Sequence, residues 1–483
     1  MRRPARSGYI PSITRTPLVS GLMLTVFAGL SACGEGAPAP ERRPNVLLYV
    51  ADTLRADGLG CYGNAVVKTP HLDAFASEAM VFERAFAPSS WTRASMASIL
   101  TGTAPGVHGA EGRFDLLLDS ALMMSEIFKA AGYDVGSITT NRNVGSFFGF
   151  DQGFGAGDFI ELYEPSSAER VTVSELTTLA DDVTRHATEW MSTATEPFCL
   201  IVHSIDPHSP YMPPSEWDLY GAGIESAVDG SQQSLYKLNK TRTAADEARV
   251  VSLYYGEIAF NDHAFGTLLD WMRAKDLLDQ TVVAFTSDHG EEFWERGERG
   301  HGKTLNEKAL HVPLILRYPA RLARGSRVGR IAGTLDLLPT LLDLARFPVH
   351  ETMDGKSLLL PASNRENVIL SSCKLSELNL SSARNERWKL VFDAATGKRQ
   401  LFDLEGVEVE SKNVIGKHRD IASELYQELA KSFERDSKRR KEIYGADSSN
   451  TLGELPPEIE QALEDMGYVG NDSETIDGES SDE

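Results

Sequence analysis

Short apolar runs alternate with amphipathic segments along most of this chain. Residues 45–50, 198–203 and 281–286 are continuous apolar runs, as expected of parallel strands buried on both faces. Residues 173–191 and 244–274 carry apolar side chains at helical spacing. This alternation predicts an α/β fold in which helices cover both faces of a large, mostly parallel, doubly wound sheet.

The pattern continues up to about residue 362 and defines the main domain, residues 45–362. A helix is predicted over 120–131, because Gly132 is a suitable residue to end it, and a strand follows over 133–139. Further strands are predicted over 311–317 and from Val328 onward.

The character of the sequence changes after residue 362. Short strand-like runs at 368–371, 388–392 and 400–404 are separated by turn residues, and a helix is predicted over 419–433. We therefore expect a small subdomain over 363–440, an antiparallel sheet closed by a helix. Residues 441–483 are predicted to form an acidic, largely disordered tail, since no apolar period persists beyond Gly470.

The amino terminus has the layout of an export signal. Several arginines precede an apolar run, residues 18–30, that is too short for a comfortable membrane span. The run ends in Leu30-Ser-Ala-Cys33-Gly34, which resembles a bacterial lipobox. We expect residues 1–33 to be a lipoprotein signal with Cys33 lipidated, and 34–44 to be a flexible tether. The protein would then be held at a membrane of the bacterial cell envelope, facing the periplasm or the cell surface. The alternative is a plain cleaved signal with an incidental cysteine.

The net charge bears on which macromolecules the protein binds, and the cysteines bear on metal sites and disulfides. The formal charge of −22 argues against nucleic acid and anionic membrane surfaces. Cys61, Cys199 and Cys373 lack the spacing of a metal site and could form at most one disulfide, so buried free thiols are expected.

Polar side chains follow the predicted strands. Asp52 comes just after the first strand, and Asp288 and His289 follow the strand over 281–286. Because the carboxyl ends of parallel strands meet at one edge of a sheet, these groups should lie together. The stretch 87–109 reads as a hydroxyl-rich turn that begins a buried helix. A hydroxyl at that helix start would lie beside free backbone N–H groups, which is where an anionic ester would bind and react.

The helix start carries a family resemblance. Ser95-Met-Ala-Ser-Ile-Leu-Thr-Gly102 resembles the sulfatase signature C-x-P-S-R-A-S-x-L-T-G, found within the alkaline phosphatase-like superfamily. This register places Thr92 at the nucleophile, Ala94 at the family's proline and Met96 at its arginine. If the arginine of the signature is instead aligned with the arginine of this segment, Ser89 takes the place of the nucleophile. That alignment loses the match to the A-S-x-L-T-G end of the signature. No cysteine lies between Cys61 and Cys199, so no formylglycine is expected.

The resemblance covers roughly residues 45–433 and implies an alkaline phosphatase-like α/β/α sandwich with a small C-terminal sheet. It also implies one divalent metal ion, held by Asp52, Asp288, His289 and the Thr92 oxygen. Thr53 stands where the family usually has a second aspartate. Two carboxylates with an imidazole favour Mn²⁺ or Zn²⁺, and Ca²⁺ remains possible.

Other motifs imply substrate contacts. His203-Ser-Ile-Asp206-Pro-His208-Ser-Pro-Tyr211 resembles a sulfatase segment in which His208 would face the ester anion and Asp206 would shape the pocket or hold a second metal. In Gly300-His301-Gly302-Lys303, Lys303 would bind the anion and His301 would act as general acid. His311 is a further candidate for ligand or acid, and Arg142 a substitute for a lysine and histidine common in the family.

These expectations combine into a functional hypothesis. The chain should be a metal-dependent hydrolase that cleaves sulfate esters, or closely related phosphate esters, with Thr92 as nucleophile. Thr92 and His289 favour phosphoryl chemistry, so the first alternative is a phosphodiesterase or phosphotransferase acting on envelope phospholipids or glycans. The second is a catalytically silent sulfatase-like binding protein, against which the retained Asp52, Asp288 and His289 argue.

Overall fold

A computed structural model describes residues 42–162, 180–238, 241–361, 363, 367–375, 377–406, 409–445 and 448–465. The predicted signal, Cys33 and most of the tether lie outside the described residues, as do residues 466–483. Within the described part of the chain, none of the helices has the length and apolar character needed to cross a bilayer.

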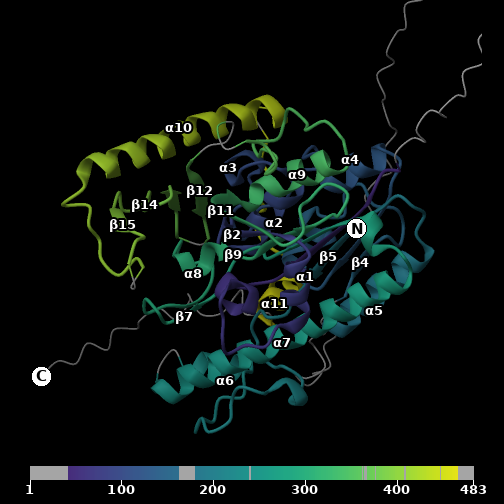
Figure 1. Cartoon of the computed structure of the whole chain (residues 1–483). Coiled ribbons are helices and arrows are strands. Elements are labelled where there is room, and N and C mark those ends of the chain that lie inside the picture. Colours follow the sequence, from purple (N-terminus) through teal and green to yellow (C-terminus); the bar gives the residue numbers. More distant parts are fainter. Residues whose placement is uncertain are drawn as a thin grey trace, which may run out of the picture. The chain divides into compact units, whose positions relative to one another are not determined.

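The main sheet is mixed but mostly parallel (Figure 1), with strand order β11-β2-β10-β6-β1-β5-β3-β4 and β9 paired to β2. Its strands are β1 (Asn45–Ala51), β2 (Met80–Phe86), β3 (Asp134–Thr139), β4 (Phe159–Glu161), β5 (Phe198–Ser204), β6 (Thr281–Thr286), β9 (His311–Val312), β10 (Leu314–Arg317) and β11 (Ser326–Gly333). β1 lies between β5 and β6 and pairs parallel with both. β10 runs antiparallel to β6 and β2. The predicted large, mostly parallel sheet is confirmed.

Alternate side chains of β1 enter two separate cores, because successive residues of a strand point to opposite faces. Val46, Leu48 and Val50 join the core beneath α2 (Thr92–Thr101), α4 (Met124–Ala130) and α9 (Leu337–Leu344). Leu47 and Tyr49 join the opposite core, beneath α1 (Pro70–Ser77), α5 (Ala180–Thr193) and α7 (Ala244–Ala274). Helices therefore cover both faces, as the apolar pattern predicts. The shorter elements are α3 (Pro105–His108), α6 (Gln232–Lys237), α8 (Glu307–Leu310), β7 (Glu292–Phe293) and β8 (Arg299–Gly300).

A second sheet follows the main domain. Its antiparallel strands are β12 (Ile369–Cys373), β13 (Leu380–Arg384), β14 (Trp388–Asp393) and β15 (Arg399–Asp403). The long helix α10 (Arg419–Tyr444) lies along this sheet in Figure 1 and buries Ala422, Leu425 and Leu429 against it. The predicted antiparallel subdomain is confirmed, with β13 added. That strand escaped prediction because its sequence, LSSAR, is largely polar.

The chain is ordered further than the tail prediction allows. α10 continues to Tyr444, and α11 (Pro457–Asp465) follows. Leu455 and Leu463 are buried in the core of the main domain, on the α2 face of the sheet. The prediction of a disordered tail from residue 441 is thus wrong for the described residues up to 465. A few well-placed leucines stabilise this segment by tertiary contacts, despite its acidic composition.

Cys61, Cys199 and Cys373 are free thiols, and the last two are buried. The expectation of buried free thiols is confirmed for Cys199 and Cys373, whereas Cys61 is half-buried.

Candidate active site

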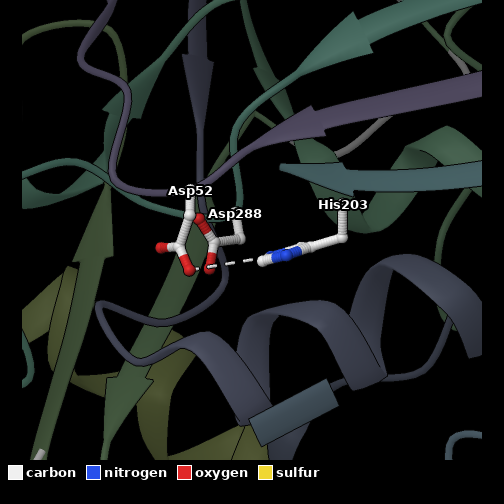
Figure 2. A group of neighbouring side chains, drawn as sticks. All are labelled: Asp52, His203 and Asp288. Carbon is white, nitrogen blue, oxygen red and sulfur yellow. Dashed lines mark ion pairs between the residues drawn. The ribbon is translucent and has the colours of Figure 1, made fainter. Parts of the chain in front are cut away.

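Asp52, His203 and Asp288 converge at the carboxyl ends of three adjacent strands, β1, β5 and β6 (Figure 2). One ligand atom from each lies within 4.8 Å of the others, and all three side chains are buried. The His203 Nε2 to Asp52 Oδ2 distance is 3.8 Å. The sheet therefore brings Asp52 and Asp288 together as predicted. His203 is the member of this group that the sequence did not single out as a ligand.

The electrostatics of this group suit a cation. Burial raises the pKa of Asp52 well above its usual value, and the nearby Asp288 raises it further. Burial also acts to raise the pKa of Asp288, but His289 and His203 outweigh it and lower that pKa. Two buried carboxylates at close range repel unless a positive charge compensates them.

Unsatisfied atoms point to the same conclusion. Asp52 Oδ1, Asp288 Oδ2 and both ring nitrogens of His203 are buried without a hydrogen-bond partner among the described residues. Buried polar atoms are normally hydrogen-bonded, so a cluster of exceptions calls for an explanation. Carboxylate oxygens and imidazole nitrogens are common ligands of divalent metals, so these residues fit the predicted ion.

Thr92 is the first residue of α2 and is fully buried. Its Oγ1 lies 3.1 Å from His289 Nε2. His289 Nδ1 lies 2.9 Å from the Gly290 carbonyl oxygen, which can only accept, so Nδ1 carries the proton. In the neutral ring Nε2 is then the acceptor for the Thr92 hydroxyl. His289 Nε2 also lies 3.4 Å from Asp288 Oδ2, so Thr92 sits directly beside the carboxylate group.

The turn before Thr92 is held by segments distant in sequence. Gly302 N donates to Ser90 O at 2.7 Å, and Ser90 Oγ donates to Thr304 O at 2.6 Å. On another side, Ser372 N of β12 donates to Pro88 O at 2.9 Å. The C-terminal subdomain therefore supports the turn that carries Thr92. Ser89, the alternative nucleophile, is buried and forms a strand-like bridge to Ser372.

Two buried residues that the sequence did not single out support the site. Asn141 Nδ2 donates to Asp52 Oδ2 at 2.6 Å. Its neighbour Arg142, the predicted substrate contact, is half-buried. Arg93, next to Thr92, is completely buried and donates to three backbone carbonyls from residues 112, 113 and 115. The only sequence signal for Asn141 was its place directly after a predicted strand.

A histidine cluster adjoins His289. The His301 ring lies 4.6 Å from the His289 ring and 4.9 Å from the His208 ring, measured between centroids. His301 Nδ1 is 3.1 Å from Glu291 Oε1. Burial and the neighbouring His301 lower the pKa of His208 to about 3, so His208 is neutral near pH 7. The His301 ring thus lies between the rings of His289 and His208, and the catalytic roles of His208 and His301 stay predictions.

Lys303, Asp206 and His311 are the other predicted residues. Lys303 is exposed and makes no hydrogen bond or ion pair with the residues described. Asp206 accepts a hydrogen bond from Ala180 N at 2.8 Å and is hydrogen-bonded to Glu257. His311 Nε2 contacts the Glu83 carbonyl, and its ring stacks on Phe86.

A hydroxyl at a helix start, beside paired carboxylates and histidines at the edge of this sheet, defines an ester hydrolase of the alkaline phosphatase-like fold. Residues 44–347 match the sulfatase family, and residues 297–438 match the C-terminal domain described as N-sulphoglucosamine sulphohydrolase, C-terminal. The chain belongs to the sulfatase family. It is a sulfuric or phosphoric ester hydrolase, as predicted.

Individual relatives are distant but extensive in coverage. An ulvan-active sulfatase of Formosa agariphila is 26% identical over 435 residues, covering 82% of this chain and 83% of that one. An N-acetylglucosamine-6-O-sulfatase of Bacteroides thetaiotaomicron is 23% identical, covering 70% and 74%. Among solved structures, the phosphonate monoester hydrolase of Agrobacterium radiobacter superposes with a TM-score of 0.68 at 21% identity, covering 81% of this chain and 96% of the other.

Proposed function

We propose that this protein cleaves sulfate esters, or closely related phosphate esters, with a divalent metal ion and with Thr92 as nucleophile. The observation that carries this proposal is the 3.1 Å contact between Thr92 Oγ1 and His289 Nε2, beside the buried Asp52 and Asp288. Ser89 has no such contact with His289 among the described residues, which favours Thr92.

Asp52, Asp288 and His203 would hold the metal ion, with Mn²⁺ or Zn²⁺ favoured over Ca²⁺. When bound, the ion would act as a Lewis acid that offsets negative charge on the ester oxygens and on the Thr92 oxygen. The 3.1 Å contact with Thr92 Oγ1 supports a different role for His289, which the resemblance implied as a ligand: its Nε2 would accept the Thr92 hydrogen bond. This leaves His203 as the imidazole ligand.

The protein residues divide the remaining work. Thr92 Oγ1 attacks sulfur or phosphorus as its proton passes to His289 Nε2. His301 donates a proton to the oxygen of the departing alcohol. Lys303 and Arg142 offset the charge of the ester anion as they meet the substrate. Neutral His208 donates its Nδ1–H to the Ser209 carbonyl oxygen, so its Nε2 would lie beside the substrate as an acceptor. Water then attacks sulfur or phosphorus of the threonyl ester. The bond to Thr92 Oγ1 breaks, Oγ1 takes its proton back from His289 Nε2, and sulfate or phosphate is released.

The class of substrate is proposed from the relatives. One is named for activity on ulvan and another for removal of a 6-O-sulfate from N-acetylglucosamine. Sulfated carbohydrates are therefore the first substrates to test. A phosphodiester is the second candidate, because an unmodified threonine resembles a phosphoryl acceptor and a phosphonate monoester hydrolase shares the fold. A lipid on Cys33 would hold the enzyme at an envelope membrane, close to extracellular glycans.

The test is a paired assay on metal-stripped protein reloaded with Mn²⁺, Zn²⁺ or Ca²⁺. Matched aryl sulfate, phosphate monoester and phosphodiester would be offered to the wild type, Thr92→Ala and Ser89→Ala. We expect turnover that depends on metal and falls at least about 1,000-fold in Thr92→Ala, but changes little in Ser89→Ala. If turnover is lost in Ser89→Ala but not in Thr92→Ala, the nucleophile is Ser89 and not Thr92. Tight metal binding without turnover of any ester or sulfated sugar would support the silent binding protein.

A further inference from the structure

Glu291 is a completely buried carboxylate with two hydrogen-bond partners. Its Oε1 lies 3.1 Å from His301 Nδ1, and its Oε2 accepts from the Tyr211 hydroxyl at 2.8 Å. Tyr211 is itself buried and belongs to the segment that carries His208. Glu291 therefore joins two loops that both contribute histidines to the site.

The contact with His301 determines which ring nitrogen faces the reaction. An ionised carboxylate can only accept, so His301 must carry its proton on Nδ1 and donate it to Oε1. Nε2 is then the ring nitrogen that would donate to the substrate when the ring carries both protons. This arrangement of a buried carboxylate behind an imidazole fixes the tautomer and the ring orientation, and it stabilises the ring when a second proton binds.

The adjacent Glu292 shows that the arrangement is specific to Glu291. Glu292 is also buried, but its carboxylate accepts from Thr304 Oγ1 and from Asn306 Nδ2, the latter at 2.6 Å. It holds the loop that follows His301 without touching the imidazole. The two neighbouring carboxylates thus supply a matched pair for experiment.

We propose that Glu291 is a positioning residue for the general acid His301, an inference that rests on the proposed function. Oε1 of Glu291 holds the Nδ1–H bond of His301, so that the Nε2–H bond is directed at the leaving oxygen. As Thr92 Oγ1 bonds to sulfur or phosphorus, the bond to the leaving oxygen breaks and that oxygen takes the Nε2 proton. Neutral Nε2 then takes a proton from the water that attacks the threonyl ester, which restores the acid.

A general acid matters most when the leaving group is a poor one, and this supplies the test. Aryl esters whose phenols span a range of pKa values would be compared for wild type, Glu291→Gln, His301→Gln and the double variant. We expect Glu291→Gln to lower kcat about 100-fold for the least acidic phenol and less than about 3-fold for 4-nitrophenol, with KM nearly constant. The double variant should be no slower than His301→Gln, because Glu291 acts through His301.

Glu292→Gln is the matched control. Any change that it causes in kcat should be the same for all of the aryl esters. A uniform loss in Glu291→Gln, or losses that add in the double variant, would overturn the positioning role. The ¹⁵N shifts of the His301 ring give a readout that does not need turnover: the Nδ1–H tautomer should be lost in Glu291→Leu, which offers no acceptor, and kept in Glu292→Gln. Retention of that tautomer in Glu291→Leu would also overturn the role. Failure of the proposed function itself would show separately, as wild-type inactivity or as full activity of Thr92→Ala.

Discussion

Asn141 Nδ2 donates a 2.6 Å hydrogen bond to Asp52 Oδ2. Both side chains are fully buried. Asn141 follows β3, which is separated from β1 by β5, so its side chain reaches across a strand to the candidate metal group. The contact opposes the rise that burial imposes on the pKa of Asp52 and fixes the direction of its carboxylate.

Replacement of Asn141 by Ala should therefore weaken metal binding. Loss of an outer hydrogen bond to a ligand typically costs about 10- to 100-fold in metal affinity, and we expect a loss of that size for Mn²⁺ or Zn²⁺. Calorimetric titration of the stripped protein measures it, with the melting temperature of the metal-free variant as the control for folding. An unchanged dissociation constant would mean that Asn141 does not orient Asp52 for the ion.

Substitutions of His203 and His289, the two histidines near the carboxylates, should have different effects on metal binding and on turnover. His203→Ala removes a proposed ligand, so metal affinity and turnover should fall together by at least about 100-fold. His289→Ala removes the partner of Thr92, so turnover should fall by a similar factor while affinity changes less than about 3-fold. Metal titration and kcat of both variants decide this. The opposite pattern would restore His289 as the ligand, as the sequence motif implies.

The buried Asp206 and Glu257 pair should make stability depend on pH. Burial raises the pKa of Asp206 to about 6, and burial together with Asp206 raises the pKa of Glu257 well above its usual value. An acid with a raised pKa in the folded state is stabilising while protonated, so this contribution is lost as pH rises from about 4 through 6 and beyond. Glu257→Gln should donate to Asp206 without ionising, which removes much of this loss.

Melting curves at pH 5 and pH 8 test this expectation. The free energy of unfolding of Glu257→Gln relative to wild type should increase by about 1–3 kcal/mol between the two pH values. Glu247→Gln is the control and should show no such trend, because Glu247, in the first turn of the same helix, is only half-buried and its carboxylate pairs with Arg242. Equal pH dependence in wild type and Glu257→Gln would show that the pair does not share a proton.

Helix α11 should contribute to the stability of the main domain. Leu463 is 1% exposed, so Leu463→Ala should lower the free energy of unfolding by about 2–4 kcal/mol. Glu464→Ala, at an exposed position of the same helix, should change it by less than about 0.5 kcal/mol. Denaturant unfolding measures both. If neither substitution changes the free energy of unfolding, this segment is disordered in solution, as its composition suggests.

Local patterns of apolar residues predict much of the fold. The apolar runs that became β1, β5 and β6 need burial on both faces, and only a sheet between two helix layers provides it. Since those strands are parallel, their ends share an edge, so the sequence alone predicts that Asp52 and Asp288 lie at the same edge of the sheet. The helix start at Thr92 is similarly local.

Tertiary structure decided which side chains meet beyond that edge. The order β6-β1-β5 brings His203 to the carboxylates, and the reach of Asn141 and the pairing of Glu291 with His301 depend on loops whose paths no periodicity encodes. Likewise β10 runs antiparallel, and Leu455 and Leu463 hold α11 and the residues just before it against a core that is distant in sequence. Periodicity reports only which face of an element is apolar. The partner of that face, and the polar contacts around it, depend on the packing of the whole domain.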